Sequence, residues 1–446
     1  MIFGKHLLTA ALALVLAIAH CLPALAEPKI YIDLSAPAAR KIPLAIQGFG
    51  YIGKDGANEP VVKEIAKEIV DALRSDLLFS NLFGIIDEKA HPSTLQEPHD
   101  TVADFEKWRQ AGADGLIKGG FSVEGGRLTI EIRYFDCLSE KQVTGRRFTG
   151  SVANARRVVH YFSDMLHEEL TGERGIFTTR IMFVSPKSGN KEVYIADYDG
   201  KNAIQITRNG STNLFPQWAP DGKSVIYVSY KKRFPFLYRL DLATGKDTVI
   251  SSRPGVNIGA RFSPDGTKIA LTLSGPKSPE LNLLDLKTGG YTRLTDNYAI
   301  DISPAWSADG SALAFVSDSA GNPNIFMLNF SDNKPKRLTY TGAFNASPAW
   351  SPDSGRIAFA RQDNGRFNIW VMDPDGSDAA QLTFEGNNKN PSWSPDGRHL
   401  IFSSESRGQS SLYIMRPDGT GLTRLSTGIG NETAPVWSPL PLPLQR

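Results

Sequence analysis

Short apolar stretches alternate with polar turns along the chain from about residue 179 onward. Stretches such as residues 224–228 and 312–316 are rich in β-branched and aromatic residues and are bounded by Gly, Pro, Asp or Ser, which is typical of strands. Each follows a motif close to Trp-Ser-Pro-Asp-Gly. Pro presets φ and Gly permits a positive φ, so the motif predicts a tight turn between two strands.

The motif repeats at a nearly constant spacing. Its aromatic residues are Trp218, Phe262, Trp306, Trp350, Trp393 and Trp437. The spacing is 44 residues, except for 43 between Trp350 and Trp393. A period near 44 predicts a β-propeller with one four-stranded sheet per repeat. Third strands are expected at 236–240, 281–284, 324–328, 368–372 and 411–415, and short fourth strands at 293–295, 337–339, 381–383 and 424–426.

The two ends of the repeat array predict the number of blades. Residues 179–184, 192–196 and 203–207 match the second, third and fourth strands of a blade, and the first strand is missing before them. The last motif, at 434–439, supplies a first strand and nothing more. We therefore expect a six-bladed propeller over residues 173–446, in which the C-terminal strand closes a split blade and removes the open sheet edges.

Residues 1–26 have the pattern of a secretory signal peptide. Lys5 and His6 precede an apolar run at 7–19, and Ala24-Leu25-Ala26 fits a small-x-small cleavage site. Cleavage leaves Cys137 as the only thiol. We expect an exported protein located in the periplasm.

Residues 27–172 have no repeat and predict a small α/β domain. Helices are expected at 59–78, at 101–110 with Asp100 as its cap, and at 153–170, where Gly172 ends the helix. Strands are expected at 30–34, 44–46, 83–86, 115–118, 127–134 and 143–148. The fold class is thus a small N-terminal α/β domain followed by an all-β propeller.

Catalytic motifs are absent from the sequence: it contains no Gly-x-Ser-x-Gly, His-Glu-x-x-His, Walker or dinucleotide motif. We expect no catalytic residue, no cofactor and no metal. His160 and His167 lie seven residues apart on one predicted helix, which fits an ordinary helix face better than a metal pair. The net charge of +2 gives no argument for nucleic acid binding.

A polar residue stands five positions before each repeat aromatic. These residues are Asn213, Asn257, Asp301, Asn345, Asn388 and Glu432. One interpretation is a ring that receives a partner at the mouth of the channel, with Arg261 and Lys389 adding positive charge nearby. The other is that these side chains cap the loops at the strand starts. The sequence leaves both open.

The whole layout resembles the TolB family, the periplasmic components of the Tol–Pal system. The resemblance is carried by the domain order, the linker Leu-Thr-Gly-Glu-Arg-Gly-Ile-Phe at 170–177, the repeat and the ending Ala-Pro-Val-Trp-Ser-Pro at 434–439. It implies a non-enzymatic, monomeric protein that binds the peptidoglycan-associated lipoprotein Pal at the propeller mouth. It also implies engagement of TolA, an indirect association with the outer membrane through Pal, and a role in outer-membrane integrity and envelope constriction.

The start of the mature chain is a second candidate site. It comprises Glu27, Pro28, Lys29, Ile30, Tyr31, Ile32 and Asp33. The residues alone predict an ordinary first strand, which could also add to the sheet of a partner. The resemblance implies a segment that either docks on the protein itself or is captured by TolA. A polysaccharide lyase or a carbohydrate-binding propeller remains the alternative function.

Overall fold

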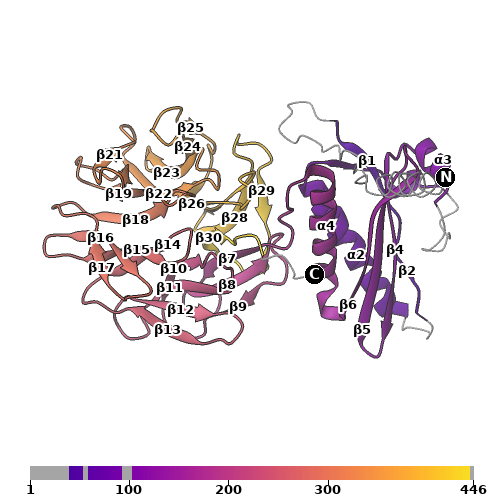
Figure 1. Cartoon of the computed structure of the whole chain (residues 1–446), viewed down its shortest axis with the longest axis horizontal. Coiled ribbons are helices and arrows are strands. Elements are labelled where there is room, and N and C mark those ends of the chain that lie inside the picture. Colours follow the sequence, from indigo (N-terminus) through magenta and orange to yellow (C-terminus); the bar gives the residue numbers. More distant parts are fainter. Residues whose placement is uncertain (1–39, 54–58, 93–102, 442–446) are drawn as a thin grey trace, which may run out of the picture.

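A computed structural model of the chain describes residues 40–53, 59–92 and 103–441. The described chain forms an α/β domain and, beside it, a β-propeller (Figure 1). None of the helices in these ranges is long and apolar enough to span a membrane. The expected signal peptide, the first strand at 30–34 and the segment Glu27 to Asp33 lie outside the described residues.

The α/β domain is built on one mixed sheet. Its strands are β1 (Ile42–Ile46), β2 (Gly50–Tyr51), β3 (Phe83–Ile85), β4 (Gly115–Glu124), β5 (Arg127–Asp136) and β6 (Lys141–Ser151). The strand order is β3-β1-β4-β5-β6, and β2 also pairs with β4. The pairs β4–β5 and β5–β6 are antiparallel, and β1 runs parallel to both of its neighbours.

Two long helices cover this sheet on the side that faces the propeller (Figure 1). They are α2 (Glu59–Phe79) and α4 (Ala155–Thr171). Ile69 and Leu73 of α2 and Phe162 of α4 are fully buried against the sheet. The smaller elements are η1 (Glu88–Ala90), α3 (Phe105–Gln110) and η2 (Val152–Asn154).

The helix boundaries follow the local capping chemistry. Gly172 adopts φ 76° after α4, as expected for a residue that ends a helix. Helix α3 begins at Phe105, four residues later than predicted, and Asp104 caps it by accepting the Lys107 N–H. The predicted cap Asp100 lies outside the described residues. The turn η2 replaces the first residues of the helix predicted from 153.

The propeller has six four-stranded sheets in the described residues. Blade 1 contains β10 (Asn213–Trp218), β11 (Ser224–Ser229), β12 (Phe236–Asp241) and β13 (Asp247–Ser251). Blade 2 contains β14 (Asn257–Phe262), β15 (Lys268–Ser274), β16 (Pro279–Asp285) and β17 (Tyr291–Arg293). Blade 3 contains β18 (Asp301–Trp306), β19 (Ala312–Ser317), β20 (Asn324–Asn329) and β21 (Pro335–Arg337).

The other three blades follow the same order. Blade 4 contains β22 (Phe344–Trp350), β23 (Ile357–Asp363), β24 (Arg366–Met372) and β25 (Ala380–Gln381). Blade 5 contains β26 (Asn387–Trp393), β27 (Leu400–Ser406), β28 (Gln409–Met415) and β29 (Thr423–Leu425). Blade 6 contains β30 (Thr433–Trp437), β7 (Arg180–Ser185), β8 (Glu192–Asp197) and β9 (Ile204–Gln205).

Blade 6 confirms the predicted split closure. The C-terminal strand β30 pairs antiparallel with β7, and Trp437 lies opposite Ile181. The Trp437 indole N–H donates to Thr179 Oγ1 at 2.8 Å. The first and last strands of the propeller, β7 and β30, are far apart in the sequence but lie side by side in one sheet. This pairing closes the ring.

The fourth strands begin and end one or two residues earlier than the sequence predicts. β17 ends at Arg293, although Leu294 and Thr295 were expected in the strand. Thr295 Oγ1 accepts the Leu281 N–H at 3.1 Å, and Thr339 Oγ1 accepts the Ile325 N–H at 2.9 Å in the next blade. In these two blades a side-chain hydroxyl thus takes over from the backbone ladder just beyond the end of the fourth strand.

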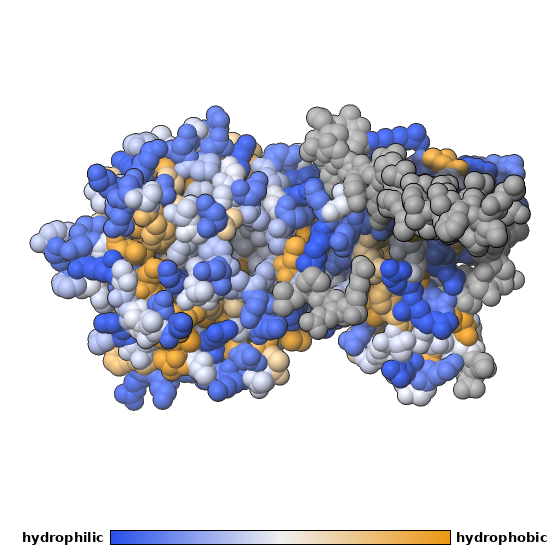
Figure 2. Space-filling view, in the orientation of Figure 1, coloured by the Kyte–Doolittle hydropathy of each residue, from blue (hydrophilic) through white to orange (hydrophobic). Residues whose placement is uncertain are grey.

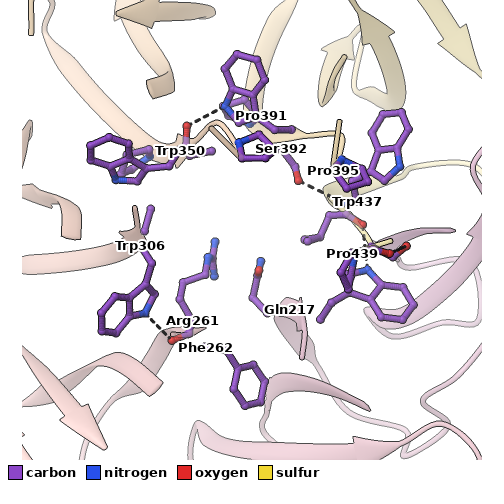
Figure 3. Close-up of a pocket in the computed structure, with 18 of the residues that line it drawn as sticks. Gln217, Arg261, Phe262, Trp306, Trp350, Pro391, Ser392, Pro395, Trp437 and Pro439 are labelled. Atoms are coloured by element: carbon purple, nitrogen blue, oxygen red, sulfur yellow. Dashed lines mark hydrogen bonds between the residues drawn. The ribbon is translucent and has the colours of Figure 1, made fainter. Parts of the chain in front are cut away.

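Repeat aromatics join neighbouring blades. The indole N–H of Trp306 donates to the Arg261 carbonyl at 3.1 Å, and that of Trp393 donates to the Ala349 carbonyl at 3.0 Å (Figure 3). Trp218 bonds the Val436 carbonyl in the same way. These residues are architectural, since each one links its blade to the blade before it.

Candidate functional site

The propeller has two chemically different ends. Each innermost strand begins at one end, which we name the mouth, and reaches its aromatic residue at the other, which we name the turn end. The loops between consecutive blades lie at the mouth, and the Ser-Pro-Asp-Gly turns lie at the turn end. Because the linker enters β7 at Arg180, opposite the end of β30, the α/β domain is attached at the turn end.

All six predicted ring residues begin or directly precede an innermost strand, or lie one residue inside it, as expected. Their side chains are buried, however, with exposures between 0% and 4%. Asn257 illustrates the cause: its Oδ1 accepts the Ser251 hydroxyl and the Arg253 N–H, and its Nδ2 donates to the Arg253 carbonyl. The loop before the strand wraps around the amide.

The same arrangement recurs in the other blades. Asn345 Nδ2 donates to the Thr341 carbonyl and to Asn324 Oδ1, and Asn388 Nδ2 donates to the Glu385 carbonyl. Glu432 Oε1 accepts the Gly430 N–H at 2.9 Å. Loop capping is therefore what these side chains do in the structure, and direct contact with a partner stays a prediction.

Asn213 and Asp301 complete the set. Asn213 Nδ2 donates to Glu192 Oε2 at 2.7 Å, and Asp301 Oδ2 accepts from Asn297 Nδ2 at 2.9 Å. The other oxygen of Asp301, Oδ1, is buried without a hydrogen-bond partner. Because these side chains are buried, replacing one of them would mainly alter the conformation of a mouth loop and not the chemistry of the exposed surface.

The two predicted cations occupy different places. Lys389 lies near the mouth, with its ammonium 4.9 Å from the Phe367 ring centroid. Arg261 lies further along its strand and points into the channel (Figure 3). We predicted both residues near one rim from their spacing to the repeat aromatic. The spacing alone does not show how deep in the channel each residue lies.

Each innermost strand contains a bulge where it lines the channel. The pairing register shifts in all six strands, for example between Ile258 and Arg261. The bulged residues all have φ between 49° and 64°: Phe215, Gly259, Ser303, Ser347, Asn390 and Ala434. Because this positive-φ conformation recurs in every blade, the bulge is a regular part of the channel wall and not a local irregularity.

Three exposed aromatic residues lie on consecutive loops at the mouth. Tyr298, Tyr340 and Phe384, which we call the aromatic arc, are 84%, 71% and 74% exposed. They occupy the loops that follow β17, β21 and β25. The Lys277 ammonium lies 5.1 Å from the Tyr298 ring, and the Arg337 guanidinium lies 4.8 Å from the Tyr340 ring. This part of the mouth is therefore aromatic, and cationic side chains lie over two of its three rings. Lys277 also pairs with Asp296 at 2.9 Å.

The sequence reasoning did not identify the aromatic arc. A signal was present, since each aromatic follows a Leu-Thr pair by one to three residues, as in Leu338-Thr339-Tyr340. The alternation of apolar and polar residues identifies strands, whereas these three residues lie in the loops that follow the strands. Elsewhere, hydrophobic residues reach the visible surface of the propeller in separate patches between hydrophilic side chains (Figure 2).

A buried polar network joins the α/β domain to blade 6. Both oxygens of Asp76 lie 2.9 Å from His160 Nδ1, and the Tyr198 hydroxyl donates to Asp76 Oδ1 at 2.7 Å. Burial lowers the pKa of His160, but the charge and hydrogen bond of Asp76 outweigh this and hold the pKa above its usual value. Arg156 pairs with Asp199 in the same interface.

One set of potential metal ligands occurs in this interface. Donor atoms of His160, Asp197 and Asp199 lie within 4.8 Å of one another. Arg156 already pairs with Asp199, and Asn202 donates to Asp197 at 2.7 Å. We interpret the group as part of the interdomain network. His167 bonds Glu173 and Thr171 instead, so it does not pair with His160.

Family models match both parts of the chain. The TolB amino-terminal domain matches residues 30–143, and the TolB beta propeller domain matches residues 167–441. The exact domain boundaries at 26, 172 and 446 stay predictions.

The single described cysteine, Cys137, is buried and unpaired.

Individual relatives agree with these matches. The chain is 38% identical over 241 residues to the Tol-Pal system protein TolB of Desulfosudis oleivorans, and 38% identical over 224 residues to that of Geobacter sulfurreducens. These matches cover 53% and 50% of this chain and span about half of the relatives' own length, 54% and 50%.

A solved structure extends the similarity over both domains. The crystal structure of TolB from Acinetobacter baumannii has a TM-score of 0.76 and 26% identity, and the match covers 90% of this chain and 97% of that chain. The predicted fold class is confirmed by this agreement. The propeller model alone matches more than half of the chain, and we conclude that the chain belongs to the TolB family.

Proposed function

We propose that the chain is a non-enzymatic, monomeric scaffold of the Tol–Pal system in the periplasm. In this proposal it binds the peptidoglycan-associated lipoprotein Pal at the propeller mouth and TolA through the segment 27–33. It would thereby support outer-membrane integrity and envelope constriction during division. Family membership and the names of the relatives support the system.

The aromatic arc is the observation that supports docking at the mouth. Exposed aromatic side chains and Arg are typical of protein interfaces, where a few such anchors supply most of the binding energy. The rim favours this type of contact over catalysis, since the propeller sequence contains one histidine, His399. That residue lies next to the α/β domain, stacked on Phe79.

The capped loops explain how the mouth keeps its shape. Each buried ring residue holds the loop before its strand, and the aromatic arc lies on three of these loops. A partner would therefore meet a surface that is already ordered, which reduces the entropy cost of association. The ring and the arc act together in this proposal, one as support and the other as contact.

Titration calorimetry against the soluble domain of Pal from the same organism tests the proposal. We expect one-to-one binding to the wild type and at least about tenfold weaker binding to the triple variant Tyr298→Ala, Tyr340→Ala, Phe384→Ala. Leu422→Ala is the control, because Leu422 is 56% exposed at the turn end. Equal affinity of the triple variant and the wild type would contradict docking at the arc.

Binding of TolA is tested separately. Removal of residues 27–33 from the mature chain should abolish binding to TolA, because strand addition needs the backbone of that segment. The affinity for Pal supplies the control for folding. Undiminished TolA binding by the shortened chain would reject the segment as the docking site.

A further inference from the structure

The channel contains a positive charge without a counter-charge. Arg261 has no carboxylate partner among the described residues, and its one hydrogen bond runs from Nη1 to the adjacent Ala260 carbonyl at 3.1 Å. Burial lowers the pKa of Arg261 to about 10, so the guanidinium is still charged at neutral pH. A partly desolvated and unpaired cation is an unfavourable arrangement that an anion would relieve.

The space around Arg261 is large enough for a small molecule. The channel encloses a cavity of about 390 Å³, lined by all six innermost strands and the turns after them. No Asp or Glu belongs to that lining. The residues equivalent to Arg261 in blades 3 and 4 are Ala305 and Ala349, whose short side chains take up little of the cavity that they line with Arg261.

Other groups in the wall complement an anion. Gln217 and Arg261 come from neighbouring blades, and both point into the channel (Figure 3). The Gln217 side chain makes no hydrogen bond to any other described residue, so its amide N–H groups can donate to a ligand. Ser303 and Asn390 lie on the bulges of the same wall and add polar groups.

We propose that the propeller channel binds one small oxyanion, a carboxylate or phosphate group, between the Arg261 guanidinium and the Gln217 amide. The planar guanidinium presents two parallel N–H groups, which match the two oxygens of a carboxylate or phosphate. The site lies inside the channel, away from the exposed aromatic arc. It therefore does not depend on the proposed docking of Pal.

Calorimetry with acetate, succinate and inorganic phosphate at constant ionic strength tests the site. We expect saturable one-to-one binding of at least one of them to the wild-type protein, and a loss of at least about tenfold in affinity in Arg261→Met. Arg127→Met, which removes one exposed charge from the distant α/β domain, should bind like the wild type. Arg261→Lys, which keeps the charge but not the paired donors, should retain part of the affinity.

The carboxylate could also belong to a side chain of a polypeptide. A second titration distinguishes this source from a free anion. A short Glu-containing peptide with blocked ends is titrated in the same way. Binding of the peptide alone, lost in Arg261→Met, assigns the site to a polypeptide side chain, and binding of the free acids assigns it to a free anion. Absence of both, or equal binding by wild type and Arg261→Met, overturns the proposal.

Direct localisation covers the case in which a variant folds poorly. Crystals of the wild-type protein soaked in selenate should show an anomalous selenium peak in the channel beside Arg261, placed so that selenate oxygens accept the guanidinium N–H groups. A peak elsewhere and none in the channel would overturn the site irrespective of the variants.

Discussion

Phe79, the last residue of α2, stacks on His399 of blade 5 with ring centroids 4.3 Å apart and an interplanar angle of 22°. The Trp437 ring is also stacked with the imidazole, with ring centroids 6.3 Å apart and an interplanar angle of 30°. His399 Nδ1 is buried without a hydrogen-bond partner. The neutral imidazole thus packs as an aromatic ring between the α/β domain and the closing strand of the propeller.

This packing predicts a loss of stability in mild acid. Burial lowers the pKa of His399 from 6.5 to about 4, with Arg416 and Arg398 acting in the same direction and Asp396 against it. The folded protein therefore binds this proton more weakly than the unfolded chain does. The full contribution of His399 is present above pH 6.5 and decreases as the pH falls toward 4, by at most about 3 kcal/mol.

Denaturant unfolding of the wild type and of His399→Gln at pH 7.5 and 5.0 measures this effect. Gln stays neutral, so the variant should lose less stability between the two pH values. The comparison isolates His399 from the other titrating groups, which both proteins share. Identical pH dependence of the two proteins would show that the imidazole does not titrate in this way.

The linker between the domains tolerates no side chain at Gly175. A Cβ there would lie 2.4 Å from Asp164 Oδ1 and 2.7 Å from Asp164 Cα. Asp164 accepts the Phe177 N–H at 2.7 Å and the Thr178 N–H at 3.1 Å, and so fixes the linker to α4. Displacing it should loosen the domain junction.

Gly175→Ala should therefore increase the rate of proteolytic cleavage near residues 172–178 and lower the melting temperature. Gly50→Ala is the matched control, because nothing lies within 4 Å of a Cβ at that position. If both variants are cleaved and melt like the wild type, the contact with Asp164 does not constrain the linker.

Two tryptophans in equivalent positions should differ in their response to Phe. Trp306 Nε1 donates to the Arg261 carbonyl, whereas Trp350 Nε1 is buried without a partner. Phe262 occupies the same place in blade 2, so the site accepts a phenyl ring. Trp306→Phe should cost about 1 kcal/mol more than Trp350→Phe in the free energy of unfolding, the usual value of one hydrogen bond. Equal losses in urea titrations would mean that the interblade bond contributes nothing.

The closing strand should be essential for the propeller. Truncation after Asn431 removes β30 and leaves β7 as an exposed edge. We expect a large drop in melting temperature and self-association of the shortened chain, measured by calorimetry and light scattering. Truncation after Pro441 keeps β30 and should melt like the full chain. A stable monomer after the first truncation would disprove the closure by β30.

The repeat carried most of the information about the fold. Turn chemistry and a spacing of 44 residues predicted the blades, and the missing first strand before residue 179 predicted the split blade. Helix α3 was less well predicted, because Asp100 and Asp104 are both acceptable caps and the sequence does not choose between them. Local patterns define elements well and their ends poorly.

The candidate site was only partly predictable. The spacing placed Asn257 and its equivalents at the strand starts, but it did not show that a loop buries each side chain. Arg261 was assigned to the rim because its depth in the channel depends on the bulge at Gly259, a three-dimensional feature. Tyr298, Tyr340 and Phe384 became visible only when the folded loops showed which aromatic side chains stay exposed.

Hydrogen–deuterium exchange of the protein with and without the soluble domain of Pal tests the central claim most directly. The account predicts slower exchange in the mouth loops 296–300, 340–343 and 384–386, with unchanged exchange in the Ser-Pro-Asp-Gly turns at the opposite end. Protection confined to those turns or to the α/β domain would contradict docking at the mouth.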